Sequence, residues 1–155
     1  MAGNKAGSSL DRTRIITEYA RMWPRDVFDY PTKGRKVLAD DLTILQNAGV
    51  YVLYRDDVPY YIGKTDHRLG KRLFVHAKRP TSRYDYFWNH FSVFVIPDKT
   101  HRAIVESLLI AAMPTANSAK PKEFDRHKVP PAIIKMMRDQ RRHKATMGMP
   151  SIEER

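Results

Sequence analysis

The segment from Gly49 to His76, GVYVLYRDDVPYYIGKTDHRLGKRLFVH, constrains the fold more than any other part of the chain. Its first residues are β-branched and aromatic, which favours a strand over Gly49–Leu53. Arg55–Asp57 supplies turn residues, and Val58–Gly63 predicts a returning strand. Pro59 cannot donate a ladder hydrogen bond, so we expect it at a strand start or a sheet edge. The segment therefore predicts a β-hairpin.

A basic amphipathic helix is predicted directly after the hairpin, over Arg68–Arg79, with Pro80 ending it. Its apolar residues recur at i, i+4 and i+8 and are expected to face the core. The basic residues occupy the neighbouring stripe of the same helix. The apolar row is Leu69, Leu73 and Ala77, and the basic row is Arg68, Arg72, His76 and Arg79. The basic row is therefore expected at the rim of the core.

The second half of the chain predicts one strand and two helices. Phe87–Ile96 is apolar enough for a central strand. A helix is predicted over Lys99–Met113, with Asp98 as its N-cap and Pro114 ending it. The last helix is predicted to open at Pro130 or Pro131, and it is strongly basic at its C-terminal end.

Before the hairpin, apolar residues at 15, 16, 19 and 22 or 23 predict an amphipathic helix over Leu10–Trp23, ended by Pro24. Residues 24–41 hold two prolines and show no clear period, which predicts a loop. A short helical turn is expected between Val37 and the hairpin.

The charge balance indicates a polyanionic partner. The chain has 28 Lys and Arg against 17 Asp and Glu, a formal net charge of +11. Such an excess of positive charge most often indicates that the partner is nucleic acid. There is no cysteine, which excludes disulfides and thiolate zinc sites, and the six histidines show no ligand-type spacing. No apolar run could cross a membrane and no signal-peptide segment is evident, so we expect a cytoplasmic protein.

Glu106 is the most informative single residue. Its helix is apolar almost all round from Ala103 to Met113, which predicts a buried element. A buried carboxylate needs compensation, because removing water from an ionised group is costly. The partner could be an arginine, a lysine or a metal ion. A structural salt bridge, to Arg72 or to another arginine, is the simpler interpretation of this helix by itself.

Other polar residues near the hairpin could also take part in chemistry. Arg72 and His76 are neighbours on one helix, and such a pair suits a phosphodiester, because the guanidinium grips phosphate while the imidazole relays a proton. Tyr51 and Tyr61 lie on the two strands, where tyrosine usually serves packing. A tyrosinate could act on water only if nearby cations lowered its pKa, and Lys64 is a candidate for that.

Together these residues resemble the GIY-YIG nuclease family. Gly49-Val50-Tyr51 and Tyr61-Ile62-Gly63 resemble its paired motif, with valine in place of isoleucine in the first. Lys64 follows as in many members, and Arg72 and His76 match the family's Arg-x-x-x-His helix. Glu106 matches the metal-binding glutamate, and Asn117 resembles the asparagine that braces the site. The resemblance covers about 49–117, under half of the chain.

The resemblance implies a metal-dependent DNA endonuclease. Glu106 would hold one Mg²⁺ or Mn²⁺ with waters and the substrate phosphate. Arg72 would share the charge of the transition state. Tyr51 would be the general base or would position the attacking water. Lys64 and His76 would polarise or deprotonate Tyr51, and Tyr61 would form a hydrogen bond within the site or hold the phosphate. The roles of Tyr51, Tyr61 and His76 in the mechanism could be exchanged without contradicting the sequence.

The fold implied is α/β (α+β), with a three-stranded, mostly antiparallel sheet flanked by helices. The core would span 49–120, after a flexible N-terminus at 1–9 and a helical and loop extension at 10–48, and before a basic helical extension at 121–155. Phosphate contacts are expected from basic residues of two helices. They are Arg68, Arg79, Arg141, Arg142 and Lys144.

Two alternatives stay open. The chain could be a non-catalytic nucleic-acid-binding module of the same fold, which would bind without metal-dependent nicking. RNA could replace DNA as the substrate. A minimal nuclease core needs help to choose its target, and a homodimer is one way to supply it.

Overall fold

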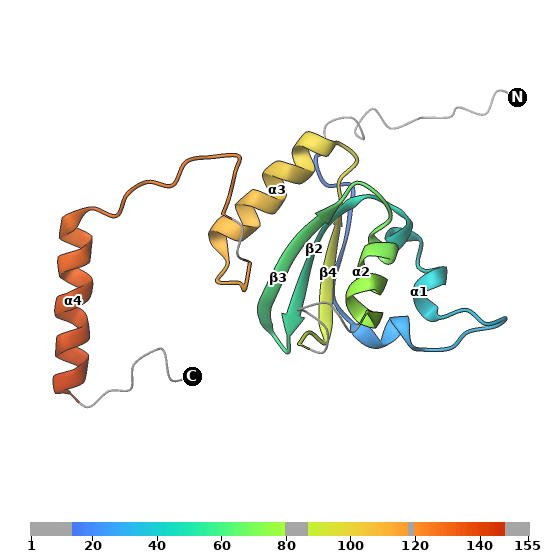
Figure 1. The fold of residues 1–155 in the computed structure, drawn as a ribbon, viewed down its shortest axis with the longest axis horizontal. Helices are drawn as coiled ribbons and strands as arrows, with labels where there is room; N and C mark the ends of the chain where they lie inside the picture. Colours follow the sequence, from blue (N-terminus) through green and yellow to red (C-terminus); the bar gives the residue numbers. More distant parts are fainter. Residues whose placement is uncertain (1–13, 80–86, 118–119, 148–155) are drawn as a thin grey trace, which may run out of the picture. The chain divides into compact units, whose positions relative to one another are not determined.

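The computed structural model describes residues 14–79, 87–117 and 120–147. The chain divides into two compact units, Met1–Phe124 and Asp125–Arg155. The first unit holds a β-sheet and most of the helices, and the second holds one helix, α4 (Pro131–Thr146) (Figure 1). The predictions for 1–9 and for Leu10–Thr13 lie outside the described residues.

The sheet of the first unit has four strands in the order β1-β4-β2-β3, and every neighbouring pair is antiparallel. The strands are β1 (Glu18–Pro24), β2 (Gly49–Arg55), β3 (Val58–Thr65) and β4 (His90–Val95). The predicted class, a mixed fold with an antiparallel sheet and flanking helices, is confirmed. The predicted number of three strands is wrong, because β1 adds a fourth.

The strand β1 replaces the helix predicted over Leu10–Trp23. Its residues pair with the outer edge of β4, from Glu18 opposite Val95 to Pro24 opposite His90. A break in register between Ala20 and Trp23, with φ of +55° at Met22, interrupts the alternation of side chains. The apolar spacing is therefore compatible with a helix, but backbone hydrogen bonds to the edge of β4 stabilise a strand instead.

The predicted hairpin is confirmed as β2 and β3, joined by a two-residue turn at Asp56 and Asp57. Asp56 has a φ of +55°, and Asn89 braces the turn, because its Oδ1 accepts from the Asp56 amide and its Nδ2 donates to the Asp56 carboxylate. The strand β3 is the edge of the sheet, which is where Pro59 was expected.

The remaining elements are helical. The predicted helices are present as α2 (Leu69–Lys78), α3 (Lys99–Ala112) and α4. The stretch predicted as a loop with a short helical turn contains η2 (Arg25–Phe28), α1 (Leu38–Asp41) and η3 (Thr43–Gln46). Each of these is a single turn, too short to show a period in the sequence.

Helices cover both faces of the sheet (Figure 1). On one face Tyr51 and Leu53 pack with α2, η2 and η3 in the larger apolar cluster. On the other face Val50 and Val52 pack against α3 in a smaller cluster. The central strand β2 is therefore buried on both sides, and its residues alternate between the two clusters.

The helix α3 is less buried than its sequence predicts. Ile104 is 42% exposed and Leu108 is 56% exposed, so the expectation of a helix buried all round is wrong. One stripe of α3 packs on the sheet, and among the described residues of the first unit no second layer covers its outer side. None of the residues of α4 is buried. Among the helices of the described ranges, none combines the length and apolarity that crossing a bilayer requires.

Gly49 lies where β2 meets β4, and the approach is too close for a side chain. A Cβ at this position would overlap the carbonyl oxygen of Phe94 and press on Leu69. We expect Gly49→Ala to lower the free energy of unfolding by about 1–3 kcal/mol, the usual effect of overpacking. Urea denaturation monitored by circular dichroism would measure it. Glu18→Gln, at an exposed strand position, is the control, and equal stability of Gly49→Ala and wild type would contradict this packing.

Candidate active site

Tyr51 is the centre of the site. It lies in the middle of β2, its side chain has no exposed surface, and its ring faces α2. In the antiparallel register it stands opposite Gly63 of β3. A Cβ at Gly63 would overlap the Tyr51 hydroxyl, so the glycine makes room for the phenol. The two motif residues therefore depend on each other sterically.

Two side chains of α2 meet the hydroxyl of Tyr51. Its Oη lies 2.8 Å from Nε2 of His76, and Nε of Arg72 donates to it over 3.4 Å. Arg72 and His76 are one helical turn apart, so α2 presents both to the same atom. His76 is buried, whereas the Arg72 side chain reaches the surface. The result is a buried phenol with a ring nitrogen beside it and a cation extending outward.

The surroundings of Tyr51 favour its neutral form. Burial raises the pKa of the Tyr51 hydroxyl far above its ordinary value, and the hydrogen bond from Arg72 offsets only part of that effect. The same hydrogen bond raises the pKa of Arg72, which remains a guanidinium. At neutral pH the site therefore holds a protonated phenol beside a fixed positive charge. Such a phenol can donate a proton or relay one between His76 and a group at the surface.

Tyr61 completes an aromatic cluster beside the hydroxyl. Its ring centroid lies 6.2 Å from that of Tyr51 and 5.8 Å from that of His76. Tyr61 is only partly buried and belongs to the edge strand β3. The two tyrosines and the histidine, which come from three different elements, thus lie together on the α2 side of the hairpin.

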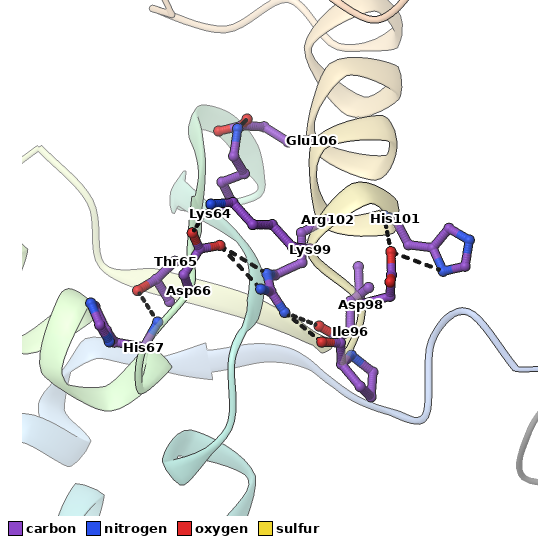
Figure 2. A network of polar contacts seen from close by, with 11 residues as sticks. Lys64, Thr65, Asp66, His67, Ile96, Asp98, Lys99, His101, Arg102 and Glu106 are labelled. Atoms are coloured by element: carbon purple, nitrogen blue, oxygen red, sulfur yellow. Dashed lines mark hydrogen bonds and ion pairs between the residues drawn. The ribbon is translucent and has the colours of Figure 1, made fainter.

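Glu106 and Lys64 form an ion pair on the opposite side of the hairpin, with 2.6 Å between Lys64 Nζ and Glu106 Oε2 (Figure 2). Lys64 stands opposite Val50 in the register, so its side chain points toward α3 rather than α2. The Glu106 side chain is 19% exposed and that of Lys64 is 37% exposed. The partner expected for Glu106 is therefore a lysine. Glu106 is still near enough to Tyr51 for its charge to raise the pKa of the phenol further.

A second set of charges ties the end of β3 to the start of α3. The buried guanidinium of Arg102 donates to Asp66 from Nε and Nη2, over 3.2 and 3.1 Å. Its Nη1 donates to the carbonyl oxygens of Ile96 and Pro97, over 2.7 and 2.9 Å (Figure 2). Lys99 pairs with the other oxygen of Asp66 at 3.3 Å. Glu106 lies one turn beyond Arg102, so this network fixes the helix that carries it.

Neither Asp66 nor Arg102 was identified from the sequence. A signal was present, because a cation in the first turn of a helix opposes the helix dipole and suggests a specific partner. Burial raises the pKa of Asp66, but its bonds to Lys99 and Arg102 outweigh that and hold the pKa below its usual value. Asp66 is therefore ionised at neutral pH and available as that partner.

Asn117 lies against the edge strand. Its Oδ1 accepts from the Ile62 amide over 2.8 Å, and its Nδ2 donates to the Ile62 carbonyl over 2.7 Å. The Ala116 amide also donates to the carbonyl of Tyr60. Asn117 thus completes the backbone hydrogen bonds of the residue between Tyr61 and Gly63.

The basic residues expected to contact nucleic acid are all exposed. Arg68 and Arg79 flank the two ends of α2, in the unit that holds the candidate site. Arg141, Arg142 and Lys144 lie on α4, in the other unit.

The chain matches no protein-family model, no curated protein and no solved structure.

Glu106 offers a divalent cation a single carboxylate ligand, and that carboxylate is paired with Lys64 in this structure. The described residues contain no group of three or more His, Asp or Glu side chains that could hold a metal ion. Mg²⁺, however, often takes one or two carboxylates and completes its shell with water and substrate phosphate. Glu106 already accepts a cationic group, the Lys64 ammonium. A metal bound there would therefore depend on the substrate for further ligands.

The raised pKa of Tyr51 predicts alkaline destabilisation. Below about pH 10 the phenol is protonated in both folded and unfolded chains, so this group adds no pH dependence. Above that pH only the unfolded chain releases the proton, and stability falls as the pH rises. Urea denaturation between about pH 9 and 11 should show the fall, and Tyr51→Phe should reduce it. Tyr19→Phe, at a 69% exposed position, should leave it unchanged; an unaltered slope in Tyr51→Phe would refute the assignment.

Arg102 should be irreplaceable by lysine. An ammonium cannot reach two carbonyls and a carboxylate at once, so Arg102→Lys should lower the free energy of unfolding by about 1.5–3 kcal/mol. Lys99→Gln removes only an exposed ion pair with Asp66 and should change it by less than about 1 kcal/mol. Chemical denaturation would compare the two variants. If both lose equal stability, the buried hydrogen bonds of Arg102 do not hold α3.

Proposed function

We propose that the chain is a metal-dependent DNA endonuclease with a GIY-YIG-type active site. The observation that carries the proposal is the Tyr51 hydroxyl, held between His76 Nε2 at 2.8 Å and Arg72 Nε at 3.4 Å. Simple core packing would not require a buried phenol, an imidazole and a guanidinium to converge on one point. Phosphodiester hydrolysis does require a proton relay beside a cation.

The relay runs through Tyr51 to His76. Because Arg72 donates to Oη, the phenol can direct its own proton to the imidazole when Nε2 is unprotonated. Oη then accepts a proton from the attacking water, so the phenol never has to exist as a long-lived phenolate. This arrangement suits a tyrosine whose pKa is raised by burial, because the proton leaves only as another arrives.

Arg72 and Glu106 stabilise charge around the phosphate. The guanidinium of Arg72 uses Nε for Tyr51, and its two outer nitrogens would donate to phosphate oxygens. Glu106 would hold Mg²⁺ or Mn²⁺, and a cation bound there would supply Lewis-acid stabilisation of the leaving oxygen. Lys64, which pairs with Glu106 in this structure, would be available to the phosphate if a cation took its place on the carboxylate. Tyr61 contacts the substrate from the edge strand.

DNA is supported as the substrate by charge. The net charge of +11 favours a polyanion, and exposed cations stand at both ends of α2. The alternative, a binding module without catalysis, is favoured by one observation. Lys64 is tightly paired with Glu106, the carboxylate whose charge affects the pKa of Tyr51. The two functions differ in what happens to a bound phosphodiester.

Cleavage of supercoiled plasmid tests the proposal. Wild type should nick or linearise DNA in Mg²⁺ or Mn²⁺ and not in EDTA. Glu106→Gln and Tyr51→Phe should each lower the rate at least about a hundredfold, the usual effect of removing a group that stabilises the transition state. Glu18→Gln, at an exposed position on β1, is the matched control and should cleave like wild type.

A gel-shift measurement on the same proteins separates the two functions. Glu106→Gln should still bind DNA, because it removes negative charge and leaves the exposed cations in place. Binding by every protein with no cleavage by wild type in any metal would support the binding module. Cleavage that persists in EDTA would contradict the metal-dependent mechanism.

A further inference from the structure

A groove runs along the side of α2 that does not carry His76. It encloses about 620 Å³ between α2 and the short helices that precede the hairpin. A second hollow of about 470 Å³ adjoins it and shares the residues Gln46, Arg68 and Lys71. We call these two hollows together the α2 groove. In Figure 1, α2 lies alongside the short helices that form the other wall.

The α2 groove has a positive rim. Lys36, Arg68 and Lys71 line it, all three are exposed, and within the described residues none of their side chains makes an ion pair. The two carboxylates of the groove are already engaged. Asp40 accepts from the Val37 amide at 2.9 Å, and Asp66 is paired with Arg102 and Lys99. Asp66 is thus compensated by two cations, whereas Asp40 keeps its negative charge. The three cations outnumber it, so the groove presents a net positive charge, which fits an anion.

The groove also presents an aromatic ring. Phe74 lines it and is 47% exposed, although its neighbour Leu73 is fully buried in the core. A phenylalanine half in water beside exposed cations is a poor surface for a small inorganic anion. It is a good surface for a nucleotide, whose base stacks on the ring while its phosphate meets the cations.

Arg68 connects the groove to the candidate active site. It lines both hollows, and it lies one helical turn before Arg72, whose Nε donates to Tyr51. Arg68 is the N-cap of α2, and its carbonyl oxygen accepts from the Arg72 amide over 3.3 Å. The two cations therefore stand at the same end of the helix, one on the groove and one at the candidate site. A nucleic-acid strand at Arg72 therefore has a charged path to Phe74.

We propose that the α2 groove binds a single-stranded segment of the nucleic-acid substrate, next to the phosphodiester that is cut. The base must be unpaired, because a duplex base has its faces covered by neighbouring bases and cannot stack on Phe74. The preferred substrate is therefore DNA with unpaired nucleotides beside the cut, such as a flap or bubble. That the bound strand is a substrate rests on the proposed nuclease function, whereas its binding in the groove does not depend on that function.

Binding is measured without cleavage, in EDTA, by fluorescence anisotropy of a labelled oligo-dT and of a duplex of the same length. Phe74→Ala should weaken binding of oligo-dT about tenfold, the effect of losing one stacked base, and should change duplex binding less than about twofold. Phe74→Leu keeps an apolar side chain without a ring and should fall between. Tyr19→Ala removes another exposed ring and should bind like wild type.

The cations are tested by salt dependence. The double variant Arg68→Gln, Lys71→Gln should reduce the slope of log affinity against log salt for oligo-dT by about 0.7 for each phosphate that the two side chains neutralise. The double variant Lys120→Gln, Lys122→Gln removes the same charge from exposed positions elsewhere and should leave the slope nearly unchanged. Circular dichroism confirms that each variant is folded.

Three outcomes would overturn the proposal: unchanged binding of oligo-dT by Phe74→Ala, equal weakening for single strand and duplex, or equal slopes in the two double variants. The first and third would mean that the groove does not hold the strand, and the second would mean that it does not distinguish single strand from duplex. The failure of the nuclease proposal would look different, because plasmid would stay uncut while the groove variants still bound single strands more weakly. If wild type cleaves, faster cleavage of a flap than of a matched duplex, with the difference abolished in Phe74→Ala, identifies the substrate class.

Discussion

The register of the hairpin is the constraint on which the candidate site depends. Tyr51 stands opposite Gly63, where no side chain competes for the space above the strand. A slip of one residue would put Ile62 or Lys64 opposite Tyr51 in place of Gly63 and turn the side chains of one of the two strands to the other face. Burial of β2 on both faces makes such a slip costly. The same apolar packing that stabilises the sheet therefore also positions its polar groups.

The polar groups divide between the two faces of the hairpin. α2 brings Arg72 and His76 to the tyrosine, and α3 brings Glu106 to Lys64. The phenol is buried and neutral, whereas the carboxylate is partly exposed and paired. This division suits a reaction at an edge, where proton transfer needs exclusion of water and cation binding needs access to it.

Local sequence patterns predicted the elements whose conformation is set by neighbouring residues. They failed for elements that are stabilised by contacts with distant segments. The hairpin and α2 follow from alternation, turn residues and helical spacing within one stretch. The strand β1 could not be found this way, because its partner β4 lies some seventy residues away, as in the bond from the Met22 amide to Ser92. Glu106 was identified as needing a cation, but only the register shows that Lys64 points toward it.

The segment that follows α3 covers part of the open edge of the sheet. Ala116 and Asn117 satisfy backbone groups of Tyr60 and Ile62 on β3, in the manner of a neighbouring strand. An uncovered edge would be a template for pairing with another chain. Asn117 contributes through its side chain, which offers one acceptor and one donor and then cannot extend the ladder. Around Tyr60 and Ile62, the backbone groups that a foreign strand would need are therefore already taken.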